Sequence, residues 1–79
     1  MRQKRKQLLI TFSTTTAAME MEEKAQEHAI FGRLIPLPSE ISAGCGLSWK
    51  TELKEKENVT AFLREQQLRW EAMYEWNLY

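Results

Sequence analysis

The spacing of hydrophobic residues changes several times along the chain, and each change predicts a new element. Alternate positions in residues 8–13 form one wholly apolar face, Leu8, Ile10 and Phe12, which is typical of a strand with one buried face. Residues 17–29 repeat apolar positions at helical intervals, and the hydroxyls of residues 14–16 are suited to capping that helix. Residues 30–37 predict a second strand that ends near Pro36, because proline cannot donate to a strand ladder.

The second half of the chain predicts a strand, a helix and a strand. Residues 38–46 form a loop, and residues 47–51 predict a short third strand. A polar connector follows, and Asn58 is suited to cap the next helix. The apolar face of that helix holds Val59, Phe62 and Leu63.

The last predicted strand, residues 70–78, has the clearest alternation in the chain. We expect its apolar stripe to face the core. The members of the stripe are Trp70, Ala72, Tyr74, Trp76 and Leu78. The resulting order, βαββαβ, predicts an α+β ferredoxin-like two-layer sandwich, a four-stranded antiparallel sheet with two helices on one face.

The formal net charge of zero hides an uneven distribution. Four of the first six residues are basic, and no other charged side chain precedes Glu20. We therefore expect residues 1–7 to be a basic N-terminal tail and residues 8–79 to be a single α+β domain. A phosphate-binding arm and a transit peptide are the alternatives for the tail. No apolar run approaches the roughly 20 residues of a membrane span, so we expect a soluble, cytoplasmic protein with no membrane partner.

The count of reactive side chains excludes several kinds of chemistry. The 79 residues include one cysteine, one histidine and no aspartate. A Ser-His-Asp triad, an internal disulfide and a closed zinc site are therefore excluded, and we expect no metal and no cofactor. His28 falls at the end of the first predicted helix, where we expect it to cap or pack rather than to act as a base for Cys45.

The loop before the third strand carries the strongest chemical signal, because Cys45 stands between two glycines. Glycine neighbours remove flanking side chains and permit a sharp turn, so a thiol there can be reached by another molecule. Lys50 is a candidate partner for an anion on that sulfur. The residues expected to support the thiol are Pro38, Ser39, Glu40, Ser42, Gly44 and Gly46. For Cys45 the alternative is a small, buried, structural side chain. For Trp49 two roles stay open: it packs under the loop, or it helps a partner to dock.

The segment from Arg33 to Lys50, RLIPLPSEISAGCGLSWK, resembles the signature of a small bacterial family, the selenium/sulfur carrier protein-like family. The resemblance extends over nearly the whole chain, apart from residues 1–7 and residues 29–32 around the start of the second strand. The matching positions are Pro36, Pro38, Glu40, Ile41, Ser42, Cys45 and Gly46.

This resemblance implies that Cys45 accepts sulfur or selenium as a persulfide or selenopersulfide and passes it to a partner. The implied partners are sulfur or selenium donor and acceptor proteins, such as a cysteine desulfurase. From the residues themselves we do not expect a nucleic-acid partner. The protein would then be a carrier or binding protein rather than a turnover enzyme. The alternative is a regulatory or protein-interaction module in which Cys45 is structural. A homodimer formed through an exposed edge strand also stays open.

Overall fold

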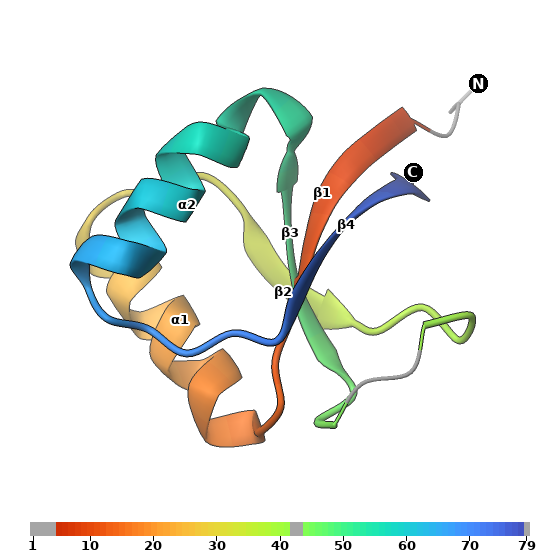
Figure 1. Cartoon of the computed structure of the whole chain (residues 1–79), viewed down its shortest axis with the longest axis horizontal. Coiled ribbons are helices and arrows are strands. Elements are labelled where there is room, and N and C mark those ends of the chain that lie inside the picture. The colour runs from red at the N-terminus through yellow and green to blue at the C-terminus, as the bar shows by residue number, and fades with distance from the viewer. Residues whose placement is uncertain (1–4, 42–43, 79) are drawn as a thin grey trace.

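A computed structural model describes residues 5–41 and 44–78. Its strands and helices follow one another in the predicted order. The helices lie on one side of the sheet, and the loop between β2 and β3 projects on the other (Figure 1). The elements are β1 (Arg5–Thr11), α1 (Thr15–Glu27), β2 (Arg33–Pro36), β3 (Leu47–Glu52), a 3₁₀ turn η1 (Leu53–Glu55), α2 (Lys56–Glu65) and β4 (Ala72–Leu78).

The four strands form one sheet in the order β2-β3-β1-β4. Each strand is antiparallel to its neighbours, so β1 and β3 are central and β2 and β4 are edges. Helix α1 connects β1 to β2 across β3, and α2 connects β3 to β4 across β1. This interleaved pair of βαβ units confirms the predicted ferredoxin-like two-layer fold.

The strand register assigns every strand residue to one of two faces. Ile10 is opposite Trp49 on β3 and Met73 on β4, and this set faces the helices. Leu9 is opposite Lys50 and Tyr74, and successive side chains of a strand point to opposite faces, so this set faces away. We call the helix-free side the open face. Its residues include Arg5, Gln7, Leu9, Thr11, Arg33, Ile35, Ser48, Lys50, Glu52, Ala72, Tyr74 and Trp76.

The main core lies between the sheet and the helices. Helix α1 contributes mostly small residues, which bring its axis close to the sheet, and α2 contributes the predicted face of Val59, Phe62 and Leu63. Burial of one large aliphatic side chain of this kind stabilises the fold by about 1.5–3 kcal/mol. The cluster consists of Leu8, Ile10, Phe12, Ala17, Ala18, Met21, Ala25, Trp49, Val59, Phe62, Leu63 and Leu68.

The prediction for the last strand was wrong about its inward face. Tyr74 and Trp76 lie on the open face and are half-buried, whereas Met73 packs against the core. Trp70 precedes the strand and is 41% exposed. A two-residue period separates two faces but does not say which one a helix covers. The pairing of β4 with β1 decides this, because it places Met73 level with the buried Ile10.

Several element boundaries also differ from the predicted ones. Strand β1 begins at Arg5, so the last three residues of the expected tail pair with β4, while residues 1–4 lie outside the described residues. Helix α2 begins at Lys56, so Asn58 lies in its first turn instead of capping it. Strand β2 begins only at Arg33, because the preceding residues close α1: the Ile30 N–H donates to the Ala25 carbonyl oxygen. No helix within the described ranges is both long and apolar enough to cross a membrane.

Candidate functional site

The loop from residue 37 to 46 joins the edge strand β2 to the central strand β3. The backbone N–H of Leu37 donates to the Gly46 carbonyl oxygen at 2.9 Å, which ties the two ends of the loop together. Farther along, the Ile41 N–H donates to the Pro38 carbonyl oxygen at 3.0 Å and forms a turn. Ile41 is itself buried, so the loop has an anchored base and an anchored middle.

The two glycines beside the thiol have different structural roles. Gly44 lies directly against the main chain of Ser13, and a Cβ atom at Gly44 would overlap the Ser13 carbonyl oxygen. Gly46 has open space around it but a φ of +74°, in the left-handed region where side chains cost energy. Gly44 therefore permits a close approach to the end of β1, and Gly46 permits the turn into β3.

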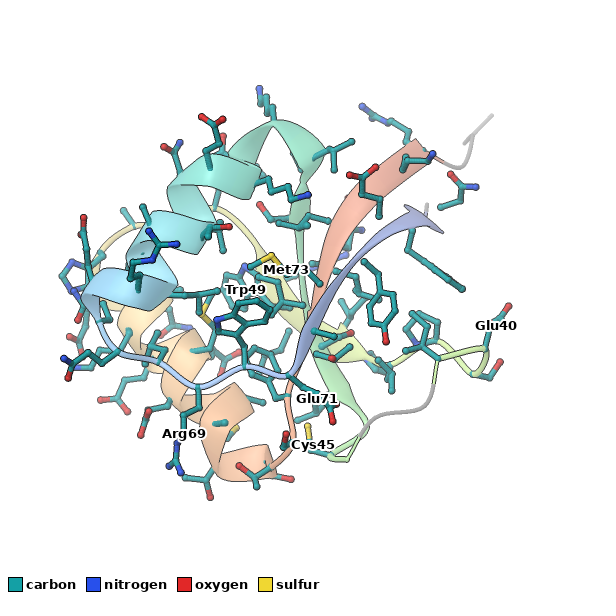
Figure 2. The ribbon with its side chains drawn as sticks, viewed as in Figure 1. Glu40, Cys45, Trp49, Arg69, Glu71 and Met73 are labelled. Carbon is teal, nitrogen blue, oxygen red and sulfur yellow. The ribbon has the colours of Figure 1, made fainter. Side chains whose placement is uncertain are left out.

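Cys45 lies at the margin of the helix-side core. Its side chain is half-buried and packs against the core cluster, and its Sγ donates a long hydrogen bond of 3.6 Å to the Leu47 carbonyl oxygen. Ser13 immediately precedes Thr14, the N-cap of α1, so the Gly44 contact places the thiol loop at the end of the sheet where α1 begins (Figure 2). The sulfur is thus held by its surroundings and still partly accessible.

Ser39 and Glu40 lie away from the sulfur (Figure 2). Ser39 and Glu40 are exposed, and the Ser39 hydroxyl donates to the Glu40 carboxylate at 3.2 Å. Figure 2 places Glu40 at the far tip of the loop, well separated from Cys45. Ser42 lies outside the described residues. Of the supporting residues predicted from the sequence, Gly44 and Gly46 are therefore the described ones that flank the thiol directly.

The structure does not bring Lys50 to Cys45. Lys50 lies on the open face opposite Arg33, in a pocket near the C-terminal end of β3, whereas Cys45 packs on the helix side before β3 begins. His28 is the C-cap of α1, and its ring meets Phe62 edge-on at 5.5 Å, so its predicted capping and packing role is confirmed.

Trp49 is 2% exposed and forms part of the core, so of its two alternatives the structure supports packing. Its Nε1 atom is buried with no hydrogen-bond acceptor among the described residues.

Sequence reasoning missed the contact of Ser13 with the thiol loop, because the two segments are about thirty residues apart. It also missed the cluster of Phe31, Arg33 and Lys50. In the described ranges, no three His, Cys or Glu side chains group as a metal site would require.

Comparison with known proteins gives one family assignment. The family model described as "Putative Se/S carrier protein-like" matches residues 7–75, which include β2, β3, both helices, the thiol loop and parts of β1 and β4. No curated protein and no solved structure matches the chain. Because the match extends over most of the sequence, the chain belongs to the Se/S carrier protein-like family.

Proposed function

We propose that this protein is a sulfur or selenium carrier and that Cys45 is its carrier thiol. The observation that supports this proposal best is the position of Cys45. It is the sole cysteine of a Se/S carrier family member, and it is half-buried between two glycines at the end of an anchored loop. A carrier needs a nucleophilic atom that a donor and then an acceptor can approach, and it needs no substrate cavity of its own.

The proposed transfer is a thiol exchange without net oxidation. The Cys45 thiolate attacks the outer sulfur of a donor persulfide, R–S–SH, and forms a new S–S bond. The donor's own S–S bond breaks, and the donor leaves as the thiolate R–S⁻. Cys45 then holds the outer sulfur as a persulfide, Cys45–S–SH. A nucleophile of the acceptor attacks that outer sulfur in turn and releases the Cys45 thiolate. The selenium version replaces the outer sulfur with selenium.

The loop geometry supports this use of the thiol. The link between Leu37 and Gly46 fixes the base of the loop, and the Ser13 contact fixes Gly44, so the main chain on both sides of the sulfur is anchored. The glycines place no side chain between the sulfur and an incoming donor. Partial burial also limits contact of a bound persulfide with solvent oxidants.

Mass spectrometry of the intact protein tests the proposal. The wild type is incubated with a cysteine desulfurase and free cysteine, and Cys45→Ser is treated in parallel. We expect the wild type to gain the mass of one sulfur atom, to lose it on reduction, and the Cys45→Ser protein to gain nothing. Failure of the wild type to load with this donor and with a small-molecule persulfide would refute the proposal.

A second candidate follows from the contact of Cys45 with the core. The sulfur packs on the core cluster and donates to the Leu47 carbonyl oxygen, as a structural cysteine in a regulatory or interaction module would. In that case Cys45→Ala lowers the free energy of unfolding but leaves partner binding and the cellular phenotype unchanged. A carrier role predicts the opposite phenotype: Cys45→Ala abolishes function even where the protein remains folded.

A further inference from the structure

The open face combines partly accessible aromatic rings with positive charge, and the proposed carrier chemistry uses neither. Tyr74 and Trp76 stand two residues apart on β4, with their rings edge-on at 6.4 Å. Leu9, opposite Tyr74 on β1, is fully buried beneath this face. Phe31, just before β2, is 61% exposed. Aromatic side chains that gather on one accessible face are typical of a binding surface.

The charged side chains of the open face are mainly cationic. Arg33 and Lys50 are directly opposite each other on β2 and β3, and Arg5 lies at the start of β1. Glu52 is the acidic residue among the open-face residues named above, and its carboxylate is 3.2 Å from the Lys54 ammonium. The helix layer has the opposite balance, since α1 carries four glutamates against one lysine. The neutral chain therefore presents a basic sheet face and an acidic helix face.

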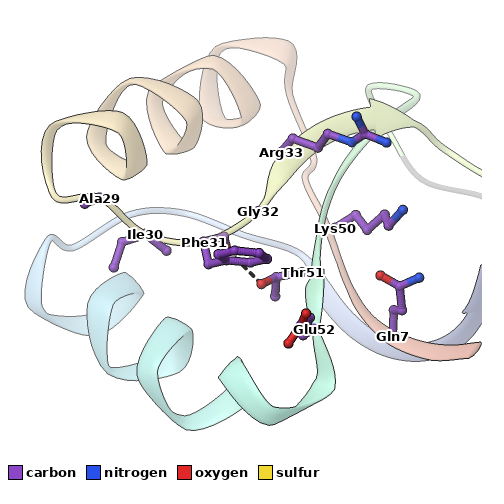
Figure 3. Close-up of a pocket in the computed structure, with 9 residues that line it drawn as sticks. All are labelled: Gln7, Ala29, Ile30, Phe31, Gly32, Arg33, Lys50, Thr51 and Glu52. Carbon is purple, nitrogen blue, oxygen red and sulfur yellow. Dashed lines mark hydrogen bonds between the residues drawn. The ribbon is translucent and has the colours of Figure 1, made fainter.

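An open pocket of about 590 Å³ lies where these features meet (Figure 3). The ring of Phe31 forms one side, and the side chains of Arg33, Lys50 and Gln7 line the other. The Thr51 hydroxyl donates to the Phe31 carbonyl oxygen at 2.7 Å, which holds the backbone that carries this ring. A flat ring beside two cations suits a ligand that has both a planar face and a negative charge.

We propose that the open face binds single-stranded RNA. One nucleotide occupies the pocket, with its base against Phe31 and its phosphate near Arg33 and Lys50, and the strand continues across the sheet to Trp76 and Tyr74. From β2 to β4 the sheet spans three strand spacings, roughly 14 Å. Four-stranded sheets whose exposed aromatics stack two or three bases are an established mode of RNA recognition.

Two features favour single-stranded RNA over other anions. Aromatic rings stack on bases of any sequence only where those bases are unpaired, and a basic surface beside them follows the phosphate backbone. Glu52, at the edge of the basic pocket, is a hydrogen-bond acceptor, so it favours a ligand that carries a donor beside its phosphate. The ribose 2′-hydroxyl is such a donor, and DNA lacks it. This proposal does not depend on Cys45 or on its chemistry.

Fluorescence anisotropy of the full chain with a labelled oligouridine of about ten nucleotides tests the proposal. We expect affinity to fall as salt rises from about 50 to 200 mM, and the logarithmic salt slope to shrink by about 0.7 for each of Arg33→Ala and Lys50→Ala. Phe31→Ala and Trp76→Ala should each weaken binding about five- to a hundredfold, the loss expected for one stacked base. Trp76→Phe keeps a ring and should lose less. Cys45→Ser should bind as the wild type does.

Matched controls distinguish RNA binding at the open face from general electrostatic attraction of RNA to the protein. Arg64→Ala removes an exposed cation from α2 on the other layer, and it should leave the affinity nearly unchanged. The deoxyuridine oligomer of the same length should bind more weakly than the uridine oligomer. Thermal unfolding of each variant shows that it is folded before its binding is compared.

Four results would each overturn the proposal. The first is no binding at low salt, and the second is equal losses in Arg64→Ala and the open-face variants. The third is equal affinity for the deoxyuridine oligomer. The fourth is a dimer that Trp76→Ala converts to monomer, which would assign the open face to a second copy of the chain.

Discussion

Gly44 and Ser13 are in direct main-chain contact, although one belongs to the thiol loop and the other to the junction of β1 and α1. Thr14, the next residue, caps α1 by accepting the Ala17 N–H at 3.1 Å. The loop that carries Cys45 therefore rests on the start of a helix, and its position is coupled to the helix cap.

Gly44→Ala is expected to lower the free energy of unfolding by about 1–3 kcal/mol, because the added methyl group meets a carbonyl oxygen of the backbone rather than a movable side chain. Urea denaturation of both proteins measures the change. Gly46→Ala is the control: it meets no atom but places a side chain at φ +74°, at a cost of about 1–2 kcal/mol. Gly46→Asn should recover part of that cost, whereas no residue should rescue position 44. A Gly44→Ala protein as stable as the wild type would contradict the contact.

Cys45 is expected to react with iodoacetamide in the native protein, because its side chain is only half-buried. Labelling should be slower than in urea, since the sulfur packs against the core. Gly44→Ala should speed the native reaction by displacing the loop. Mass spectrometry over time measures all three rates. Labelling that occurs only in denaturant would show that the thiol is inaccessible.

Glycine at either helix end is expected to stabilise the protein. Ala29 and Gln67 follow α1 and α2 with φ values of 55° and 54°, and each starts a turn whose next N–H bonds back to the helix. Ala29→Gly and Gln67→Gly relieve left-handed strain and should each raise the free energy of unfolding by about 0.5–1 kcal/mol. Ala61→Gly, at an exposed position inside α2, should lower it by about 1 kcal/mol. Equal effects at all three sites in urea denaturation would contradict this explanation.

Gly32→Ala is expected to destabilise the protein by about 1–3 kcal/mol, because its Cβ would lie 2.5 Å from the buried Nε1 of Trp49. A double-mutant cycle with Trp49→Phe isolates this contact. The smaller ring removes Nε1, so Gly32→Ala should cost less in the Trp49→Phe protein than in the wild type. Additive costs in urea denaturation would show that the two residues do not interact.

Much of the fold could be predicted from local patterns. Period-two alternation predicted β1, and helical spacing together with the hydroxyls at 14–16 predicted α1 with its cap at Thr14. The capping prediction failed at Asn58, because the 3₁₀ turn before α2 starts the helical path earlier and leaves Asn58 inside the first turn. Boundaries of this kind depend on how a segment leaves the preceding strand, which its own residues do not specify.

The candidate site was predictable only in part. A cysteine between two glycines is visible in the sequence, and so is its place between two strands. The contact with Ser13 and the wide separation of Glu40 from the thiol were not, since they depend on the path of the loop. Lys50 is five residues from Cys45 in the sequence, but the pleat of β3 sends its side chain to the opposite face.

Side-chain period, capping chemistry and composition are enough to predict the order of the elements, the α+β class and the single cysteine in its glycine turn. Which side of each strand is covered depends on the packing of the helices. In the sequence the face of β4 with Tyr74 and Trp76 is the more apolar one, but the structure covers the face with Met73 instead. The crossover helices pack on one side of the sheet only, and this placement leaves the aromatic and basic residues together on the open face.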